Sequence, residues 1–311
     1  MKTMMSFEEF VQEVKKSVEI LLGDTYDVIV EEFVKTNDIK KTALIIGRRD
    51  NATRPAIYME GFYESYISNE TDLLGVAKEV FTTFKDHKEF DASEYAISHF
   101  DEARDKIMFK IIHTASNEEL LKDVPYVPFL NLAIVFYLSL ERKEQEQMTA
   151  MIHQAHINMW NVTAQDLMEV ARVNTPAAYP ATIRSMDEVM KEIMREQLGD
   201  NYSEELANIF LMDTNTPLYV LSNPTGINGA CCMLYPDVVK EFADRENSDL
   251  IILPSSIHEV LITFDNDAMS YENYTEMVTS INEAEVAPSE RLTNSIYLFS
   301  RETGKITLVE R

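Results

Sequence analysis

A continuous apolar segment in the middle of the chain constrains the fold most strongly. Residues Phe129–Leu140 contain only Asn131 and Ser139 as clearly polar side chains. A segment that is apolar on both faces has to be covered from both sides, so we predict a strand buried inside a layered structure. A buried helix is the alternative, because a short apolar run has no period that separates the two. The run is too short to cross a bilayer.

The N-terminal segment has the signals of an amphipathic helix. Ser6 and Glu9 have the spacing of a capping box, and Gly23 follows the last residue of an apolar helical face. Two predicted strands, Tyr26–Phe33 and Thr42–Ile46, come next. Later segments repeat this mixture, with strands predicted at Leu250–Leu253 and Ile257–Phe264, a helix at Ser270–Ala284, and a closing hairpin at Ser295–Phe299 and Lys305–Val309.

These patterns predict an α+β protein, with mixed sheets flanked by helices in two packed lobes. A chain of 311 residues is large for one domain and suits two. The segment Asp200–Ser203 is the best linker, although it lacks the proline and glycine of a typical hinge. We therefore predict an N-terminal lobe at residues 1–200 and a C-terminal lobe at residues 201–311, with one continuous domain as the alternative.

The net charge restricts the partners of this chain. It has 28 Lys and Arg against 53 Asp and Glu, a formal net charge of -25. Proteins that hold nucleic acids or anionic membranes neutralise phosphates with Lys and Arg. The overall field of this chain repels such polyanions. We therefore predict that neither nucleic acid nor membrane is a partner.

The excess of acidic over basic residues is concentrated near the C-terminus. From Glu246 through Glu290 there is no Lys or Arg, while Asp and Glu occur ten times. A solvated acidic face is the ordinary interpretation of such a segment. The functional interpretation is a docking surface for a basic protein partner, and its candidate partner-binding residues are Asp265, Asp267, Glu272 and Glu276.

The two cysteines and the N-terminal segment indicate the cellular compartment of the protein. Cys231 and Cys232 are adjacent, so a disulfide between them would close a strained ring. We predict buried, reduced thiols, since the two-residue spacer of redox motifs is absent. The segment Met1–Met5 leads into a charged helix without the apolar core of a signal peptide. Both observations predict a soluble cytoplasmic protein.

The densest group of catalytic residue types is the segment Ser255–Glu259. Serine, histidine and a carboxylate are the groups with which hydrolases activate a hydroxyl. On the predicted strand, however, Ser256 and His258 share one face while Glu259 points to the other. The glycines that flank a nucleophile-elbow serine are also absent. Ser256, His258 and Glu259 are the catalytic candidates, and a half-buried structural histidine is the alternative.

Two further groups have partial metal-site patterns. His153 and His156 can project from one side of a helix, but zinc hydrolases space such histidines four apart and add a third ligand. The segment Asp265–Asp267 with Glu276 resembles part of a calcium loop, but Ser270 stands where glycine is needed. We therefore predict no cofactor and no metal, with His153 and His156 as weak metal candidates.

Several segments are typical of one family when they are taken together. They are Phe7–Phe10, Val124–Pro125 leading into Leu130–Val135, Tyr219–Asn223, and Ile252–Val260. In this order, which spans nearly the whole chain, they resemble an uncharacterised bacterial family of gut anaerobes that is known only as a domain of unknown function. The resemblance implies an intracellular bacterial protein, and it implies no activity and no catalytic residues.

The preferred functional hypothesis is a non-enzymatic cytoplasmic binding or regulatory protein that uses its acidic surface. It is motivated by the missing catalytic signatures and by the base-free segment. One alternative is a hydrolase-like enzyme with a site around Ser256, His258 and Glu259. The other is an acidic nucleic-acid mimic, which needs carboxylates spaced like phosphates on one surface. The sequence indicates neither a substrate nor an oligomeric state.

Overall fold

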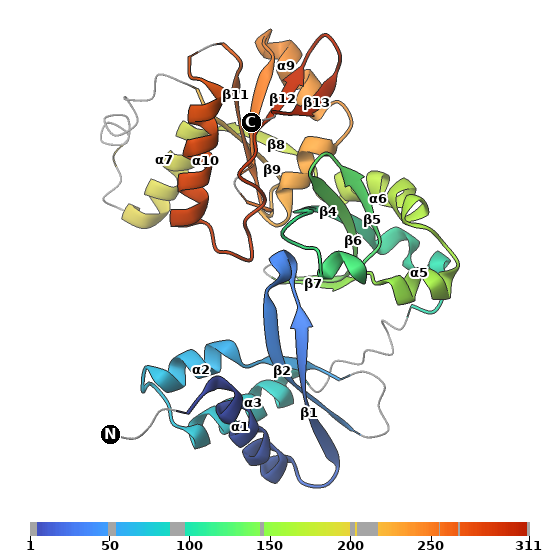
Figure 1. Ribbon diagram of the computed structural model, residues 1–311, viewed down its shortest axis with the longest axis vertical. Helices are drawn as coiled ribbons and strands as arrows, with labels where there is room; N and C mark the ends of the chain where they lie inside the picture. The colour runs from blue at the N-terminus through green and yellow to red at the C-terminus, as the bar shows by residue number, and fades with distance from the viewer. Residues whose placement is uncertain are drawn as a thin grey trace. The chain divides into compact units, whose positions relative to one another are not determined.

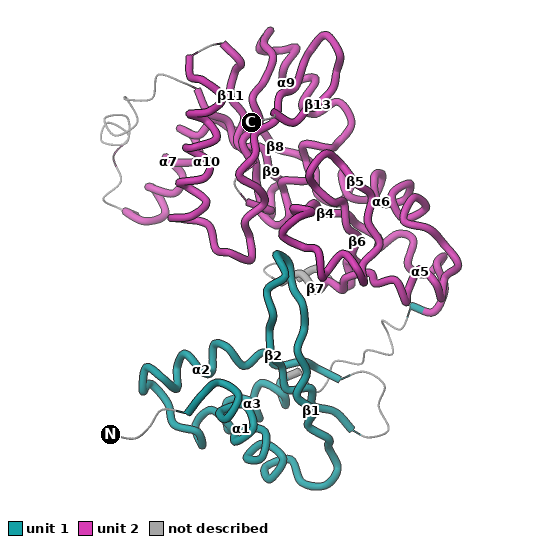
Figure 2. Tube along the Cα trace, viewed as in Figure 1, with its two compact units in different colours: residues 1–97 teal, residues 98–311 magenta. Residues whose placement is uncertain are grey.

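The chain divides into two units in the computed structural model, unit 1 at residues Met1–Ile97 and unit 2 at residues Ser98–Arg311 (Figure 2). Helices and antiparallel sheets occur in both units, so the fold is α+β as predicted (Figure 1). The structure describes residues 5–48, 54–87, 97–143, 146–199, 203, 217–254, 256–266 and 268–309.

Unit 1 packs helices against a three-stranded antiparallel sheet of order β1-β2-β3. The predicted capping box is present, since Glu9 N donates to Ser6 Oγ at 3.3 Å and Ser6 N donates to the Glu9 carboxylate at 3.0 Å. Phe10 and Val14 of the first helix lie in the same core as Val80 and Phe84 of the third. The elements are α1 (Phe7–Leu22), β1 (Tyr26–Val34), η1 (Thr36–Asp38), β2 (Lys40–Arg48), β3 (Ala56–Tyr58), α2 (Glu60–Ile67) and α3 (Leu73–His87).

The central apolar segment forms a buried strand, but this strand begins at Leu132 rather than at Phe129, which ends the preceding strand. It is β6 (Leu132–Lys143), and every residue from Leu132 to Leu138 is buried, which rules out the helix alternative. β6 pairs antiparallel with three strands, β4, β5 and β7, and the helix α6 packs against this sheet. The elements of this part are α4 (Phe100–Ala103), η3 (Arg104–Lys106), β4 (Ile107–His113), η4 (Leu120–Lys122), β5 (Tyr126–Phe129), β7 (Glu146–Met151), α5 (Gln154–Trp160) and α6 (Ala164–Ala178).

The second sheet of unit 2 has six strands in the order β13-β12-β10-β11-β9-β8, and its pairs are antiparallel. Ile251 and Leu253 face Tyr274 of α10, while Phe264, on the opposite face, stacks with Phe242 of α9. Helices therefore cover both faces of this sheet. The elements are β8 (Thr182–Ser185), α7 (Met186–Leu198), β9 (Tyr219–Ser222), η6 (Gly229–Leu234), α9 (Val238–Glu246), β10 (Leu250–Leu253), β11 (Val260–Phe264), α10 (Tyr271–Glu285), β12 (Tyr297–Ser300) and β13 (Lys305–Leu308).

The division of the chain differs from the one expected at residues 200 and 201. That position lies inside unit 2, and the two units meet in sequence at Ile97 and Ser98. The physical reason is strand pairing. β8 precedes residue 200, β9 follows it, and the two pair through Ile183 and Leu221 in one sheet. Of the expected linker, only Ser203 lies within the described residues.

Candidate functional site

The three catalytic candidates lie in a loop rather than on a strand. β11 begins at Val260, so Ser256–Glu259 belongs to the connection between β10 and β11. The register of the hairpin pairs Leu253 with Leu261, and this pairing leaves the segment between them outside the ladder. The predicted strand at Ile257–Phe264 therefore begins too early. Ser255 lies outside the described residues.

The hydroxyl of Ser256 has a complete set of hydrogen bonds. It donates to Glu259 Oε1 at 2.7 Å, and it accepts from the backbone N–H groups of His258 at 3.0 Å and Glu259 at 3.3 Å. One donor and two acceptor positions are all that a hydroxyl offers. The prediction that Glu259 points away from Ser256 is wrong, because the chain turns here. Ser256 is only 5% exposed, so its hydroxyl lies inside the loop and stabilises the turn through these hydrogen bonds.

The imidazole of His258 has different partners. Its Nδ1 accepts from Asn228 N at 3.3 Å, and its Nε2 lies 3.6 Å from Glu290 Oε1. The backbone oxygen of His258 accepts from Ser222 Oγ at 2.7 Å. A serine nucleophile needs a base that accepts its proton, and here the Ser256 proton is directed to Glu259. The loop brings the three candidates together without pairing the serine with the histidine.

A pocket of about 720 Å³ lies beside this loop. Glu259 and Leu261 line one part of it, and Ser222 with the turn Asn223–Gly226 lines another. Arg184 also reaches the pocket and forms an ion pair with Glu192. Of the three catalytic candidates, only Glu259 lines this pocket.

Two of the four acidic candidates, Glu272 and Glu276, lie along one face of α10. Ser270 caps this helix through a hydrogen bond from Asn273 N at 3.3 Å. The opposite face is buried through Tyr274, Val278 and Asn282, and Met277 packs against the same core, while Glu272, Glu276 and Glu283 are exposed. They line an acidic groove of about 810 Å³, made of Ser270, Tyr271, Glu272, Thr275, Glu276, Thr279, Ser280, Glu283 and Val309.

Glu272 and Glu276 thus share one surface, as the partner-binding hypothesis requires. Asp265 lies next to this surface, where its Oδ2 accepts from the hydroxyl of Tyr271 at 2.9 Å. Asp267 lies outside the described residues. Glu283 is a further groove carboxylate that the sequence analysis did not select; the helical spacing from Glu272 and Glu276 was the signal that could have found it.

The two metal candidates form a helix cap. His153 precedes α5, and its backbone N–H donates to His156 Nδ1 at 2.9 Å. His153 Nδ1 lies 2.7 Å from Asp123 Oδ2. Burial, and secondarily the neighbouring His153, lower the pKa of His156 below its ordinary value of 6.5. Within the described part of the chain no three His, Cys, Asp or Glu side chains group as metal ligands would.

Cys231 and Cys232 are buried free thiols, as predicted. Cys231 Sγ lies 3.7 Å from the hydroxyl of Tyr235. A hydrogen bond with Cys232, together with burial, holds the pKa of Cys231 well above its ordinary value. A thiol that keeps its proton is a poor nucleophile, so Cys231 is suited to packing rather than to reaction. The same hydrogen bond lowers the pKa of Cys232, and burial is what shields that thiol from reagents.

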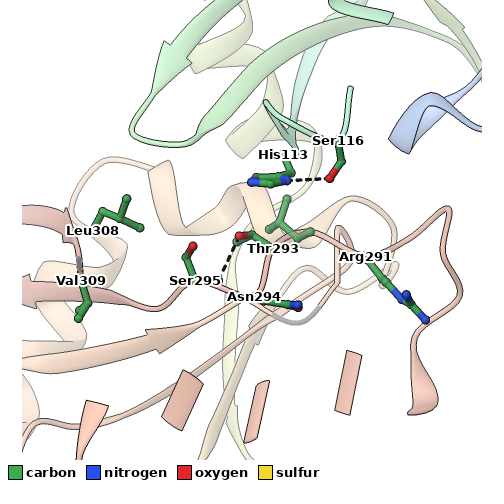
Figure 3. Close-up of a pocket in the computed structure, with 9 residues that line it drawn as sticks. His113, Ser116, Arg291, Thr293, Asn294, Ser295, Leu308 and Val309 are labelled. Atoms are coloured by element: carbon green, nitrogen blue, oxygen red, sulfur yellow. Dashed lines mark hydrogen bonds between the residues drawn. The ribbon is translucent and has the colours of Figure 1, made fainter. Parts of the chain in front are cut away.

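Sequence reasoning missed a polar pocket of about 470 Å³ in unit 2 (Figure 3). Three segments that are far apart in the chain meet there, namely the end of β4 with the following turn, the segment before β12, and the end of β13. A short Ser/Thr/Asn segment is typical of any loop, so composition gave no signal for this site. The pocket is lined by His113, Ser116, Arg291, Leu292, Thr293, Asn294, Ser295, Leu308 and Val309.

Comparison with known proteins gives one match. The model of a family described as a family of unknown function, DUF5688, matches residues 7–301. The predicted full-length resemblance to an uncharacterised family is therefore confirmed. No curated protein and no solved structure matches the chain. Among the described residues, no helix combines the length and the apolar character that a membrane crossing requires.

Proposed function

The chain belongs to the DUF5688 family, whose function is unknown, and we propose from its own surfaces that it is a non-enzymatic binding or regulatory protein. Its binding surface is the acidic groove along α10, and its partner is a basic segment of another protein. The observation that carries this proposal is the gathering of Glu272, Glu276 and Glu283 on one face that has no lysine or arginine among its described lining residues.

The carboxylates of the groove are available to a partner. Within the described part of the chain, none of Glu272, Glu276 and Glu283 forms an ion pair through its side chain. The nearest bases in the sequence are Arg245 and Arg291, outside the base-free segment, and the guanidinium of Arg291 donates to the backbone oxygen of Glu283 at 3.2 Å. Complementary charge raises the rate of encounter and selects partners of opposite sign.

The hydroxyl groups of the groove add acceptors between the carboxylates. Thr275 Oγ1 donates its proton to the backbone oxygen of Tyr271 at 2.9 Å, and Thr279 Oγ1 donates to that of Thr275 at 2.8 Å. With their protons used inside the helix, both oxygens present lone pairs outward. Lysine and arginine side chains carry only donors. A surface of acceptors is therefore the chemical complement of a basic peptide.

The hydrolase-like alternative keeps Ser256, His258 and Glu259 as its residues. The hydrogen bonds of Ser256 argue against it, because both acceptor positions of the hydroxyl are occupied by backbone N–H groups. The side chain is also nearly inaccessible, at 5% exposure. A substrate carbonyl would have to displace the loop before this oxygen could attack it.

The proposal is tested with a fluorescein-labelled peptide of alternating arginine and glycine, measured by fluorescence anisotropy against the full chain. We expect binding that weakens steeply with added salt. Because exposed ion pairs contribute about 0.2–1 kcal/mol each, the double variant Glu272→Gln/Glu276→Gln should bind about two- to thirty-fold more weakly.

The matched control removes the same number of charges elsewhere. Glu64→Gln/Glu79→Gln changes two exposed glutamates on α2 and α3 of unit 1, and it should leave the affinity unchanged. Equal weakening by both double variants would reduce the effect to net charge and contradict the proposal. An absence of binding at low salt would contradict it as well.

A further inference from the structure

The polar pocket of Figure 3 has hydrogen-bond donors whose direction is set by buried neighbours. Tyr297 is fully buried and donates its hydroxyl proton to Asn131 Oδ1 at 2.5 Å. Burial raises the pKa of Tyr297, so the hydroxyl keeps that proton. With its oxygen engaged, Asn131 turns its amide nitrogen to Ser295 Oγ at 3.1 Å and to Thr293 Oγ1 at 3.4 Å.

Both hydroxyl oxygens therefore act as acceptors toward the protein. Thr293 Oγ1 also accepts from Ser295 N at 3.1 Å, the contact drawn in Figure 3. A hydroxyl whose oxygen accepts from the protein still has its own proton to donate. Since Thr293 and Ser295 line the pocket, these two protons are available to a molecule inside it.

A second buried amide sets the direction of Asn294. Asn282, which is 1% exposed, donates from Nδ2 to Asn294 Oδ1 at 2.8 Å and to the backbone oxygen of Thr293 at 3.1 Å. Because the oxygen of Asn294 accepts this bond, its amide nitrogen is the end left for the pocket. The pocket thus gains a third donor from the same short segment.

The remaining walls of the pocket have no negative charge. His113 lies over Thr293 and Ser295 in Figure 3, with its Nδ1 2.8 Å from Ser116 Oγ. Arg291 lies at the edge, where its guanidinium donates to the backbone oxygens of Glu283 in α10 and of Val286 just after the helix. Leu308 and Val309 form an apolar wall, and none of the nine described lining residues is Asp or Glu.

We infer that this pocket binds a small molecule that carries an oxyanion, either a carboxylate or a phosphate, next to an apolar group. Oxyanions offer only acceptors, and they form stronger hydrogen bonds than neutral groups do. The three donors of Thr293, Asn294 and Ser295 suit the oxyanion, while Leu308 and Val309 suit the apolar part. The volume lies within the range of small-molecule sites. This pocket shares the lining residue Val309 with the acidic groove but none of its carboxylates, and the inference does not depend on the proposed function.

The test measures binding of four six-carbon probes by isothermal titration calorimetry on the full chain. The probes are hexanoate, hexyl phosphate, hexan-1-ol and hexylamine. We expect at least one of the two oxyanions to bind and the alcohol and amine to bind much more weakly. Tighter binding of hexanoate identifies a carboxylate ligand, and tighter binding of hexyl phosphate identifies a phosphate ligand.

Variants then locate the binding. Ser295→Ala removes one donor to a charged group and should weaken the oxyanion about tenfold or more. Asn131→Asp should abolish binding, because its carboxylate accepts from the two hydroxyls and draws their protons away from the pocket. Thr82→Val is the matched control, since Thr82 on α3 is exposed and its hydroxyl donates to Lys78 O. Glu272→Gln/Glu276→Gln should also leave oxyanion affinity unchanged.

Three results would overturn the inference. The first is equal binding of hexan-1-ol and the oxyanions, and the second is no binding of either oxyanion. The third is unchanged oxyanion affinity in Ser295→Ala, which changes a half-buried side chain on the surface of the pocket. The Ser295→Ala result stands even if Asn131→Asp lowers the stability of the fold.

Discussion

Gly229 lies where the 3-10 helix η6 meets β9 and the loop that contains His258. A Cβ atom added to Gly229 would lie 2.1 Å from Ser222 Oγ, 2.4 Å from the backbone oxygen of His258 and 2.9 Å from Asn223 N. Two of these atoms belong to the backbone, so they cannot rotate away. We predict that Gly229→Ala displaces η6 and breaks the 2.7 Å hydrogen bond from Ser222 Oγ to His258 O.

The magnitude follows from two contributions. Overpacking in a rigid interior costs about 1–3 kcal/mol. The loss of one internal hydrogen bond costs about 1 kcal/mol more. The free energy of unfolding of unit 2 should therefore fall by about 2–4 kcal/mol.

Urea unfolding followed by tryptophan fluorescence measures this change. Trp160 is the single tryptophan of the chain, and it is 8% exposed within unit 2, so its emission reports the unfolding of that unit. Gly61→Ala on α2 is the control, because nothing lies within 4 Å of the added Cβ. Urea unfolding of Gly61→Ala followed by circular dichroism should show that this variant stabilises unit 1 by about 0.5–1 kcal/mol. A Gly229→Ala protein within about 0.5 kcal/mol of the parent would refute the argument from close approach.

Three further predictions concern the residues that the sequence analysis selected. The lowered pKa of His156 favours its neutral form in the folded state, so its contribution to stability is complete above pH 6.5 and is lost as the pH falls. The difference between the urea midpoints at about pH 7.5 and about pH 5.5 should therefore be smaller in His156→Gln than in the parent protein. Ser256→Ala leaves two backbone N–H groups without their acceptor, so it should destabilise unit 2 by about 1–3 kcal/mol in the same urea assay. Parental stability of Ser256→Ala would contradict the role of this hydroxyl in holding the loop. Cys231 and Cys232 should react with a thiol reagent only after unfolding, and rapid reaction in the native protein would contradict their burial.

Local signals in the sequence predicted local structure well. The capping box at Ser6 and the helix cap at Ser270 both involve groups three residues apart, and both are present. The apolar run that forms β6 predicted a buried segment, although its pattern alone left the choice between strand and helix open. Glu272 and Glu276 were selected from the base-free segment, and their spacing on the predicted helix places them on one side. These features need no information from distant parts of the chain.

The rest depended on contacts between distant segments. The register of β10 with β11 moved Ser256 and Glu259 into a loop, where they bond to each other. The pairing of β8 with β9 joined the two sides of the expected domain boundary. Two donors of the polar pocket, Thr293 and Ser295, owe their direction to Asn131, which approaches them only in the folded chain. No periodicity or short motif carries that information.

Hydrogen–deuterium exchange with and without the arginine–glycine peptide tests the docking surface most directly. Exchange reports where bound peptide stabilises backbone hydrogen bonds. The proposed function predicts slower exchange concentrated in α10, Tyr271–Glu285, and the loss of this protection in Glu272→Gln/Glu276→Gln. Slower exchange spread evenly over acidic segments of both units, or protection confined to regions outside α10, would contradict it.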